Sequence, residues 1–248
     1  MSVARVFGAG DPLFDECFPP CADPRNATFE RQRVGDAAAL WCDDAGFLVA
    51  ALAARDAVGS VRLVRLTPHA DVTVALLRTL TPHARRPGRG RADEEARVFD
   101  VRVWAPVADD RTRDALVTAG IDGRVVVSPL GARAAPARSW DATGTNQTPC
   151  HRAAVCDRLG VVFTASQFEN AGSFWELATG RRLRRVAPLG AEMRRGKFTV
   201  MCAEFSEKGV LAFTSSNDCD AATLHLISPG DDDAEATTVQ AAAGELPL

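Results

Sequence analysis

The chain lacks several features that identify particular classes of protein. No stretch approaches the roughly eighteen apolar residues of a membrane-spanning helix, and the opening residues Met1–Phe7 lack the apolar core of a signal peptide. Neither sign of charge is in excess, because 29 Lys and Arg face 32 Asp and Glu for a net charge of -3. This balance does not favour nucleic acid or an anionic membrane as a partner. Tyrosine is absent, which says nothing about function.

Cysteine is present but shows no organised pattern. The seven cysteines are odd in number and scattered, at Cys17, Cys21, Cys42, Cys150, Cys156, Cys202 and Cys219. We therefore expect reduced thiols in an intracellular compartment, cytoplasmic or nuclear. A structural zinc site needs four ligands, and the pair Cys17 and Cys21 has no second closely spaced pair to complete it. The sequence predicts no metal ion and no cofactor.

What the sequence does contain is a repeat of short apolar runs. Its clearest copy has runs that begin at His151, Gly160, Ser173 and Thr179, and each is followed by turn residues. The third run of each copy reads Ser60–Leu66, Arg124–Leu130, Ser173–Leu177 and Thr223–Ser228. A repeat with a period of some tens of residues is typical of an architecture in which similar units stack.

The runs have the composition of β-strands. They are four to seven residues long, rich in Val, Phe, Leu, Thr and Ala, and bounded by Gly, Asp, Asn and Ser. Asp122-Gly123 is a hairpin signal, because glycine tolerates positive φ. The connections are too short for helical crossovers, so consecutive strands should pair antiparallel as meanders. The fold class is therefore predicted to be all-β.

The third copy resembles a blade of the WD-repeat β-propellers. Ser173-Phe-Trp-Glu-Leu177 is similar to the strand that ends such a repeat, and Leu177–Leu183 is similar to the link into the outermost strand. At the position of Trp175 the other copies carry Val64, Ser128 and Ile227. The resemblance implies a β-propeller, or a partial propeller, of about four antiparallel four-stranded blades.

The repeat also divides the chain into three parts. Residues 1–33 form a proline-rich extension in which Ala4–Phe7 could add one closing strand, and residues 231–248 form an acidic flexible tail. The propeller repeats occupy the residues between them, 34–230, with blades at 34–80, 97–140, 150–188 and 197–230.

The resemblance implies a structural role for polar residues in the third copy. His151 would lie where the chain enters the blade, Ser166 or Thr164 on the second strand, and Trp175 on the third. A His bonded to a hydroxyl and an indole satisfies buried polar groups. A catalytic His–Ser pair is the alternative, but no third group is in view to orient it. The sequence predicts no catalytic residue.

Two sets of charged residues are candidates for binding a partner. Carboxylates in or near the turns between second and third strands would gather on one face and favour a basic peptide, unless each bonds its own backbone; they are Asp56, Asp122, Glu169, Asp218 and Asp220. Arginines in the loop after the first copy would contact an acidic partner or RNA, unless the loop is a solvated insertion; they are Arg85, Arg86, Arg89 and Arg91.

Three functions remain open from the sequence. The first is a non-catalytic scaffold that binds protein partners through loops on one propeller face. The others are a propeller hydrolase or lactonase with a metal in the central channel, and an RNA-associated scaffold that uses Arg85–Arg91. Propellers close with roughly four to eight blades. Four copies therefore predict a small ring, a piece of a longer product, or an open propeller completed by a homo-oligomer or larger complex.

Overall fold

A computed structural model gives the structure of the chain. The described residues are 38–42, 48–53, 59–67, 73–83, 96–106, 114–131, 136–143, 148–166, 171–186, 199–216, 222–227 and 237–240. The predicted closing strand Ala4–Phe7 lies outside them. Within the described residues no helix is long and apolar enough to cross a membrane.

Sixteen strands form four separate four-stranded sheets, and within each sheet the strands follow one another in chain order. The first blade contains β1 (Ala38–Cys42), β2 (Leu48–Ala53), β3 (Val61–Thr67) and β4 (Thr73–Leu80). The second contains β5 (Val98–Trp104), β6 (Ala115–Gly120), β7 (Arg124–Pro129) and β8 (Arg138–Asp141). The third contains β9 (Arg152–Cys156), β10 (Val161–Ala165), β11 (Gly172–Glu176) and β12 (Arg182–Val186). The fourth contains β13 (Thr199–Phe205), β14 (Leu211–Ser216), β15 (Ala222–Ile227) and β16 (Thr237–Gln240).

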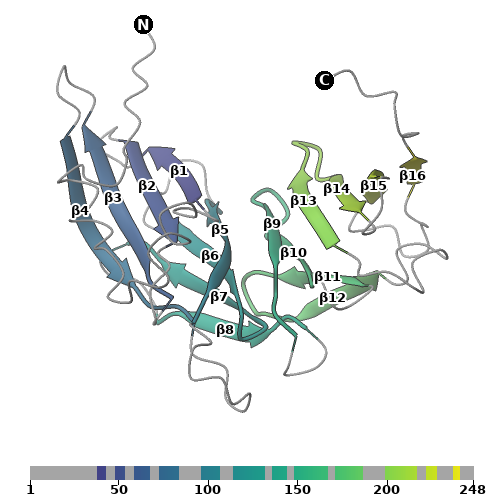
Figure 1. Cartoon of the computed structure of the whole chain (residues 1–248), viewed down its shortest axis with the longest axis horizontal. Coiled ribbons are helices and arrows are strands. Elements are labelled where there is room, and N and C mark those ends of the chain that lie inside the picture. Colours follow the sequence, from purple (N-terminus) through teal and green to yellow (C-terminus); the bar gives the residue numbers. More distant parts are fainter. Residues whose placement is uncertain are drawn as a thin grey trace, which may run out of the picture.

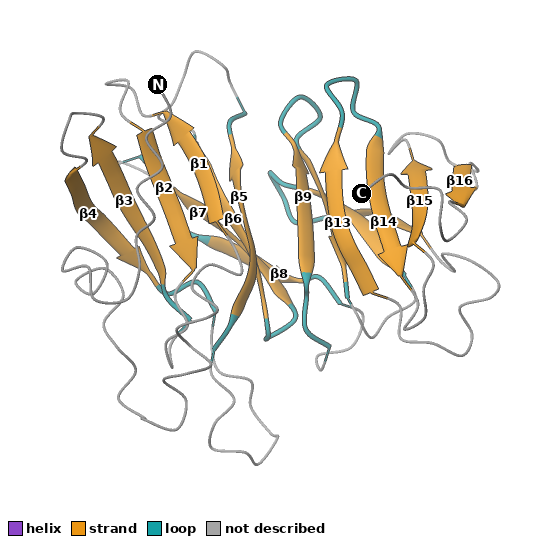
Figure 2. Cartoon of the chain, turned by 45° about the horizontal axis from the view of Figure 1, so that its top comes forward, coloured by secondary structure: helices purple, strands orange, loops and turns teal. Residues whose placement is uncertain are grey.

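The four blades follow one another along an open arc. Their first strands β1, β5, β9 and β13 lie on its concave side, and their last strands β4, β8, β12 and β16 lie on its outside (Figure 1). Turned by 45°, the molecule shows the first blade at one end of the row and the fourth blade at the other (Figure 2). Successive first strands contact each other, β1 with β5, β5 with β9 and β9 with β13. The described strands therefore form a partial propeller.

Short turns with glycine at positive φ make the meanders possible. The β6–β7 turn places Gly123 at φ 77°, and the β13–β14 turn places Gly209 at φ 83°. A Cβ atom is strained in this region, so glycine is favoured there. Each sheet can therefore reverse direction within a few residues, and all pairs of neighbouring strands are antiparallel.

Each pair of neighbouring blades is joined by its own apolar cluster. Ala51 and Leu63 of the first blade pack with Val101 and Leu116 of the second. The second and third blades share a cluster that includes Trp104, Val117, Val127, Val162 and Trp175. The third and fourth blades share another, in which the ring of Phe163 lies 5.2 Å from that of Phe174 and 5.4 Å from that of Phe213. Sheet-on-sheet burial of this kind is the main stabilisation of the arc.

The strand register agrees with the alignment of the four copies. Trp175 pairs with Val162, and each residue aligned to it pairs with a residue of the second strand in its own blade. These pairs are Val64 with Ala50, Ser128 with Leu116, and Ile227 with Leu211. The repeat found in the sequence is thus a repeat in structure, and the predicted all-β class of about four antiparallel four-stranded blades is confirmed.

The fourth blade extends further along the chain than predicted. Its outer strand β16 pairs with β15 and lies within residues 231–248, where the sequence indicated an acidic flexible tail. The acidic run Asp231–Asp233 obscures this strand, because the four residues Thr237–Gln240 are too short a run to stand out. Three of the four are β-branched, which suits them to an outer strand.

Candidate functional site

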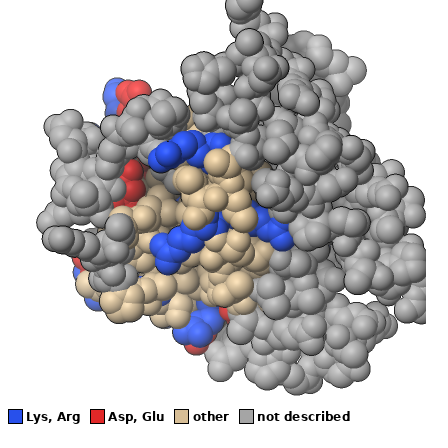
Figure 3. All heavy atoms as spheres, turned by 90° about the vertical axis from the view of Figure 1, so that its left-hand side faces the viewer, with Lys and Arg blue, Asp and Glu red and all other residues tan. Residues whose placement is uncertain are grey.

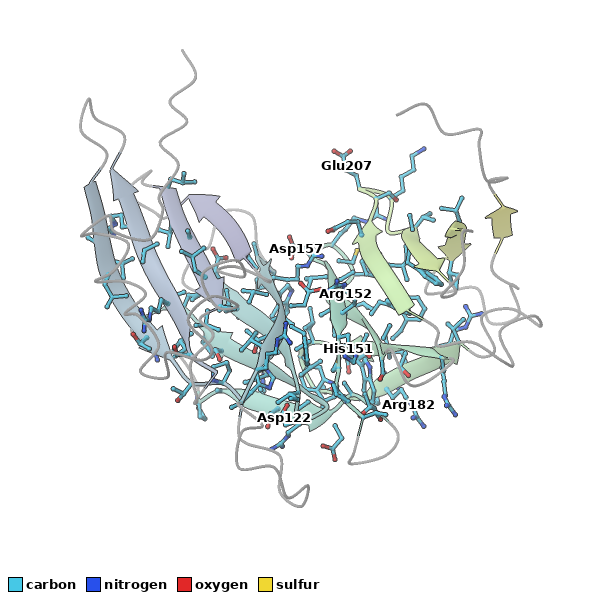
Figure 4. The ribbon with its side chains drawn as sticks, viewed as in Figure 1. Asp122, His151, Arg152, Asp157, Arg182 and Glu207 are labelled. Carbon is cyan, nitrogen blue, oxygen red and sulfur yellow. The ribbon has the colours of Figure 1, made fainter. Side chains whose placement is uncertain are left out.

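The β6–β7 turn lies at one end of the second blade. There it meets the residue before β5 and the residues before β9 of the third blade. Ile121 N donates to Arg97 O at 2.8 Å, and Cys150 N donates to Gly120 O at 3.0 Å. The residue before β5 and the residues before β9 are thereby tied to the β6–β7 turn. We call this end the turn face and define it by Arg97, Phe99, Gly120–Gly123 and Pro149–Arg152. Figure 4 shows Asp122 at this end, with Asp157 and Glu207 at the opposite end of the strands.

A buried polar network supports the turn face in the second blade. Nδ1 of His83 donates to Oδ1 of Asp122 at 2.8 Å, and Nε2 lies 3.0 Å from Oγ1 of Thr118. The Thr118 hydroxyl, which can donate to Nε2, also lies 3.4 Å from Val126 O, to which it can donate instead. His83 has no exposed side-chain surface and Asp122 has 10%. The network therefore fixes the turn through side chains that water barely reaches.

Backbone contacts complete this network. Asp122 Oδ1 also accepts a hydrogen bond from Arg124 N at 3.1 Å, as an Asp in a tight turn commonly does. The ring of His83 lies against Gly120, where an added Cβ would lie 2.4 Å from Cγ of His83. Gly120 is therefore required for close approach of the imidazole, and the turn, the ring and the second strand form one packed unit.

The third blade has a different polar pair. Nε1 of Trp175 donates to Oγ1 of Thr164 at 2.8 Å, between two buried side chains. The Thr164 hydroxyl lies 3.4 Å from Ser173 O, to which it can donate. The bond satisfies an indole N–H that would otherwise be costly to bury.

Basic and aromatic side chains cluster on the turn face beside this pair. The ring of His151 lies 4.6 Å from that of Phe99, and the guanidinium of Arg97 lies 4.9 Å from the same Phe99 ring. Arg152 Nη1 donates to His151 O at 3.1 Å and to Phe99 O at 3.5 Å. Burial, and after it the charges of Arg152 and Arg97, lower the pKa of His151 to about 4. At neutral pH the imidazole is therefore uncharged.

An acidic group is buried between the first strands of the second and third blades. Asp100 accepts hydrogen bonds from Val101 N, from Arg102 Nε and, across to β9, from Ala153 N. Burial raises the pKa of Asp100, against the opposing effect of Arg102. Arg102 also bonds Glu204 of the fourth blade. This chain of contacts ties three successive blades together on the concave side.

Four of the predicted site residues lie within the described part of the chain. Asp122 is on the turn face with its carboxylate already engaged, so a role in binding a basic peptide stays a prediction. Trp175 bonds Thr164, one of the two hydroxyl residues considered. Ser166 is buried, and the ring of His151 contacts that of Phe99 at a tilt of 40°. The remaining candidates lie outside the described residues, namely Asp56, Glu169, Asp218, Asp220, Arg85, Arg86, Arg89 and Arg91.

Sequence reasoning did not single out His83 or Thr118. Thr118 and Asp122 flank the end of one strand, four residues apart, which is a local signal for a shared network. His83 lies 35 residues before Thr118, beyond the first blade's last strand, and no local pattern links the two. Only the packing of the segment after β4 against β6 brings them together.

The described residues contain no group of three or more His, Cys, Asp or Glu side chains that could hold a metal ion. Two of the seven cysteines, Cys150 and Cys156, are described, and both are buried and form no disulfide. Cys150 is fully buried in the cluster between the second and third blades. It packs there among apolar side chains, as a small side chain of low polarity can.

Comparison with known proteins gives structural matches only. No family model and no curated protein matches the sequence. A chain of the COPII outer coat vertex on membranes matches with a TM-score of 0.54 at 14% identity, over 82% of this chain and 49% of that one. The WD40 domain of coronin from Toxoplasma gondii matches with a TM-score of 0.49 at 16% identity, over 79% and 43%. The WD40 domain of SCAP from fission yeast matches with a TM-score of 0.44 at 9% identity, over 79% and 44%.

At 14% identity the match to the coat chain shows a likeness of fold alone. The described part of the chain is a partial β-propeller of four consecutive four-stranded blades, which is the architecture that the third repeat implied. The chain spans less than half the length of the solved chains that it matches.

Proposed function

We propose that this chain is a non-catalytic scaffold that binds a protein partner through its turn face. The observation that carries the proposal is the construction of that face. The buried network of His83, Asp122 and Thr118 fixes the β6–β7 turn. The side chains beside this turn are partly exposed, namely those of Arg97, Phe99, His151 and Arg152. A preorganised surface loses little conformational entropy on binding, so it favours affinity.

The composition of the turn face suits a protein ligand. Aromatic and arginine side chains are enriched at the energetic centres of protein interfaces, and the Phe99 ring contacts both Arg97 and His151. WD-repeat folds present several such loops on one face, which supports interaction as the general role of this scaffold. Because fold alone does not fix function, the identity of the partner must come from experiment.

The thiol chemistry supports an intracellular setting for this scaffold. Cys150 lies in the segment before the third blade's first strand and Cys156 lies in that strand, and both are buried and form no disulfide. A free thiol in the core is compatible with a reducing compartment, either cytoplasmic or nuclear.

Site-specific photo-crosslinking tests the proposal. A photoreactive phenylalanine analogue would replace Arg124, which has 47% side-chain exposure next to the β6–β7 turn. The matched control replaces Arg158, an exposed arginine in the β9–β10 turn at the opposite end of the strands. We expect a partner protein to be trapped from the Arg124 position and not from Arg158. Equal trapping from both positions would argue against the turn face.

A second experiment separates a scaffold from an enzyme. The purified chain would be assayed on a panel of lactones and esters with calcium or zinc supplied. We expect no turnover above the rate in buffer. Turnover that a single substitution on the concave side abolishes would overturn the non-catalytic assignment and support a propeller hydrolase.

A further inference from the structure

The outer strands of the first and third blades, β4 and β12, share a β-bulge but carry different side chains around it. In both strands one leucine is the extra residue of a β-bulge, Leu77 in β4 and Leu183 in β12. The residues on either side are Leu76 and Arg78 in β4, and Arg182 and Arg184 in β12. Over Arg181–Arg185 the third blade carries four arginines, whereas Ala75–Thr79 carries one. Charge protects an outer strand from pairing with other chains, and β4 has little of this protection.

Strand β4 is also long and exposed. It has eight residues, against five in β12 and four each in β8 and β16. Every side chain from Ala75 to Thr79 is exposed, with Leu76 at 49% and Leu77 at 46%. It is the last strand of its sheet in the described part of the chain, so one row of its backbone groups points away from β3. Such an edge can accept an added strand through main-chain hydrogen bonds.

A groove runs beside this edge, between the first and second blades. It has a volume of about 620 Å³, and its described lining includes Arg78 and Leu80 from β4 and Ser128 and Ser139 from β7 and β8. Arg78 pairs in register with Leu63, which packs toward the second blade, so the two share that face of the sheet. Leu76 pairs with Val64 on the opposite face. The two sides of the β4 edge therefore differ, with a basic polar groove on one and leucine on the other.

The charge of this region indicates the kind of partner. Strands β3 and β4 carry Arg62, Arg65 and Arg78 and no acidic residue. Seen from the side of the first blade, basic side chains lie within the described surface and acidic side chains lie toward its margin (Figure 3). A second copy of β4 would bring like charges together, whereas an acidic segment would complement them.

We propose that the β4 edge is a strand-addition site for an extended acidic segment of a partner protein, in which acidic and apolar residues alternate. Successive side chains of a strand point to opposite faces. The acidic side chains of the added strand enter the groove beside Arg78, and its apolar side chains cover Leu76. This site is on the outside of the arc and is independent of the turn face.

Fluorescence anisotropy with a defined probe tests the site. The probe is a fluorescein-labelled peptide of four Val-Glu repeats, and the comparison peptide has four Val-Lys repeats. We expect saturable binding of the Val-Glu peptide only. Two further probes carry N-methyl groups on all valines or on all glutamates. Because alternate N–H groups of an added strand face its partner, one of these probes should lose about 10-fold or more in affinity and the other should bind nearly as well. Equal binding by both would overturn strand addition.

Substitutions locate the probe on the chain. Arg78→Glu and Leu76→Glu each place a negative charge beside the acidic probe and should each weaken binding by about 10-fold. Leu77→Glu and Leu183→Glu form a matched pair at the two bulges, with 46% and 40% exposure, and only the first should weaken binding. Unchanged far-ultraviolet circular dichroism and thermal midpoint confirm that the variants fold.

The alternative occupant is another copy of the chain. Sedimentation velocity on the unlabelled protein should show the same mass for the natural sequence and for Leu76→Arg. A dimer that Leu76→Arg dissociates would overturn the acidic segment as the occupant of β4. Equal binding by the Val-Lys peptide would overturn it as well, because charge would then play no part.

Discussion

The second and third blades share one apolar cluster but stabilise their sheets with different polar groups. In the second blade His83, Asp122 and Thr118 form a network below the turn, and Ser128 stands at the register position of Trp175. In the third blade Trp175 bonds Thr164 at that position. Thr118 and Thr164 lie at equivalent places on β6 and β10, since they pair with Val126 and Ser173, two residues before Ser128 and Trp175. The same hydroxyl position therefore bonds a histidine in the second blade and a tryptophan in the third.

In both blades the buried threonine hydroxyl has a side-chain hydrogen-bond partner, but the residue that supplies this partner differs. Each threonine is almost fully buried, at 0% and 1% exposure. The side-chain partner of Thr118 comes from the segment after β4, and that of Thr164 comes from β11. An unsatisfied buried hydroxyl costs more than the net gain from one hydrogen bond, so either partner suffices. Degenerate repeats can therefore keep one fold while a hallmark tryptophan is lost.

Removing the histidine from the second blade should have the largest effect. His83→Ala removes the side-chain partner that Asp122 and Thr118 share and opens a cavity, so we expect a loss of about 3 kcal/mol in the free energy of unfolding. Urea denaturation measures it. His151→Ala is the control in the third blade, where the ring is partly exposed, and should cost about 1 kcal/mol. Equal losses would show that the His83 network is not special to the second blade.

Glycine substitutions sharpen the comparison at the turns. Gly123→Ala places a Cβ at φ 77° and 2.7 Å from Thr143 Oγ1, so we expect a loss of about 2 kcal/mol. Gly160→Ala in the third blade has a similar φ of 61° but meets nothing within 4 Å, and should cost about 1 kcal/mol. Thermal melting of both variants measures the two losses. The loss at Gly160 reports the backbone strain alone, and the additional loss at Gly123 reports the steric crowding of the added Cβ. A larger loss at Gly160 would contradict this account.

Acid should weaken the third blade through His151. The native pKa of His151 is lowered to about 4, below the value of 6.5 in the unfolded chain, so the unfolded state binds more protons between these pH values. This contribution is fully present above about pH 6.5 and is lost as the pH falls toward 4. Because the ring is partly solvated and screened, we expect about 1–2 kcal/mol rather than the full linkage value.

Two measurements check the His151 prediction. Proton NMR should follow the imidazole signal to a midpoint near pH 4. The pH dependence of the free energy of unfolding should be flatter in His151→Gln than in the natural chain over the same range. A midpoint near 6.5 would mean that Arg97, Arg152 and burial do not act on the ring as the structure indicates.

The smallest effect is expected at the third blade's indole. Trp175→Phe removes the Nε1–Thr164 bond while keeping most of the apolar surface, so we expect a loss of about 1 kcal/mol. Thr164→Val combined with Trp175→Phe removes both partners and should cost less than the sum of the single changes. A double-mutant cycle in urea measures this coupling, and strict additivity would contradict a direct bond.

Much of the fold could be predicted from the sequence because its signals are local. The apolar runs, the turn at Asp122-Gly123 and the repeated spacing predict antiparallel strands, and the alignment of Val64, Ser128, Trp175 and Ile227 agrees with the register. Strand β16 was missed because its four residues follow an acidic run. The candidate site was less predictable, since its groups come from segments that are distant in the chain.

The sequence by itself determined which runs become strands and in what order they pair, because strand periodicity and tight turns act over a few residues. Tertiary structure alone decided that His83 meets Asp122 across 39 residues and that Phe99 meets His151 across the boundary between two blades. It also decided that β4 borders a groove while β12 offers arginines to solvent. These juxtapositions depend on how one sheet packs against the next, and burial of apolar surface between blades carries no local signal of which polar groups it brings together.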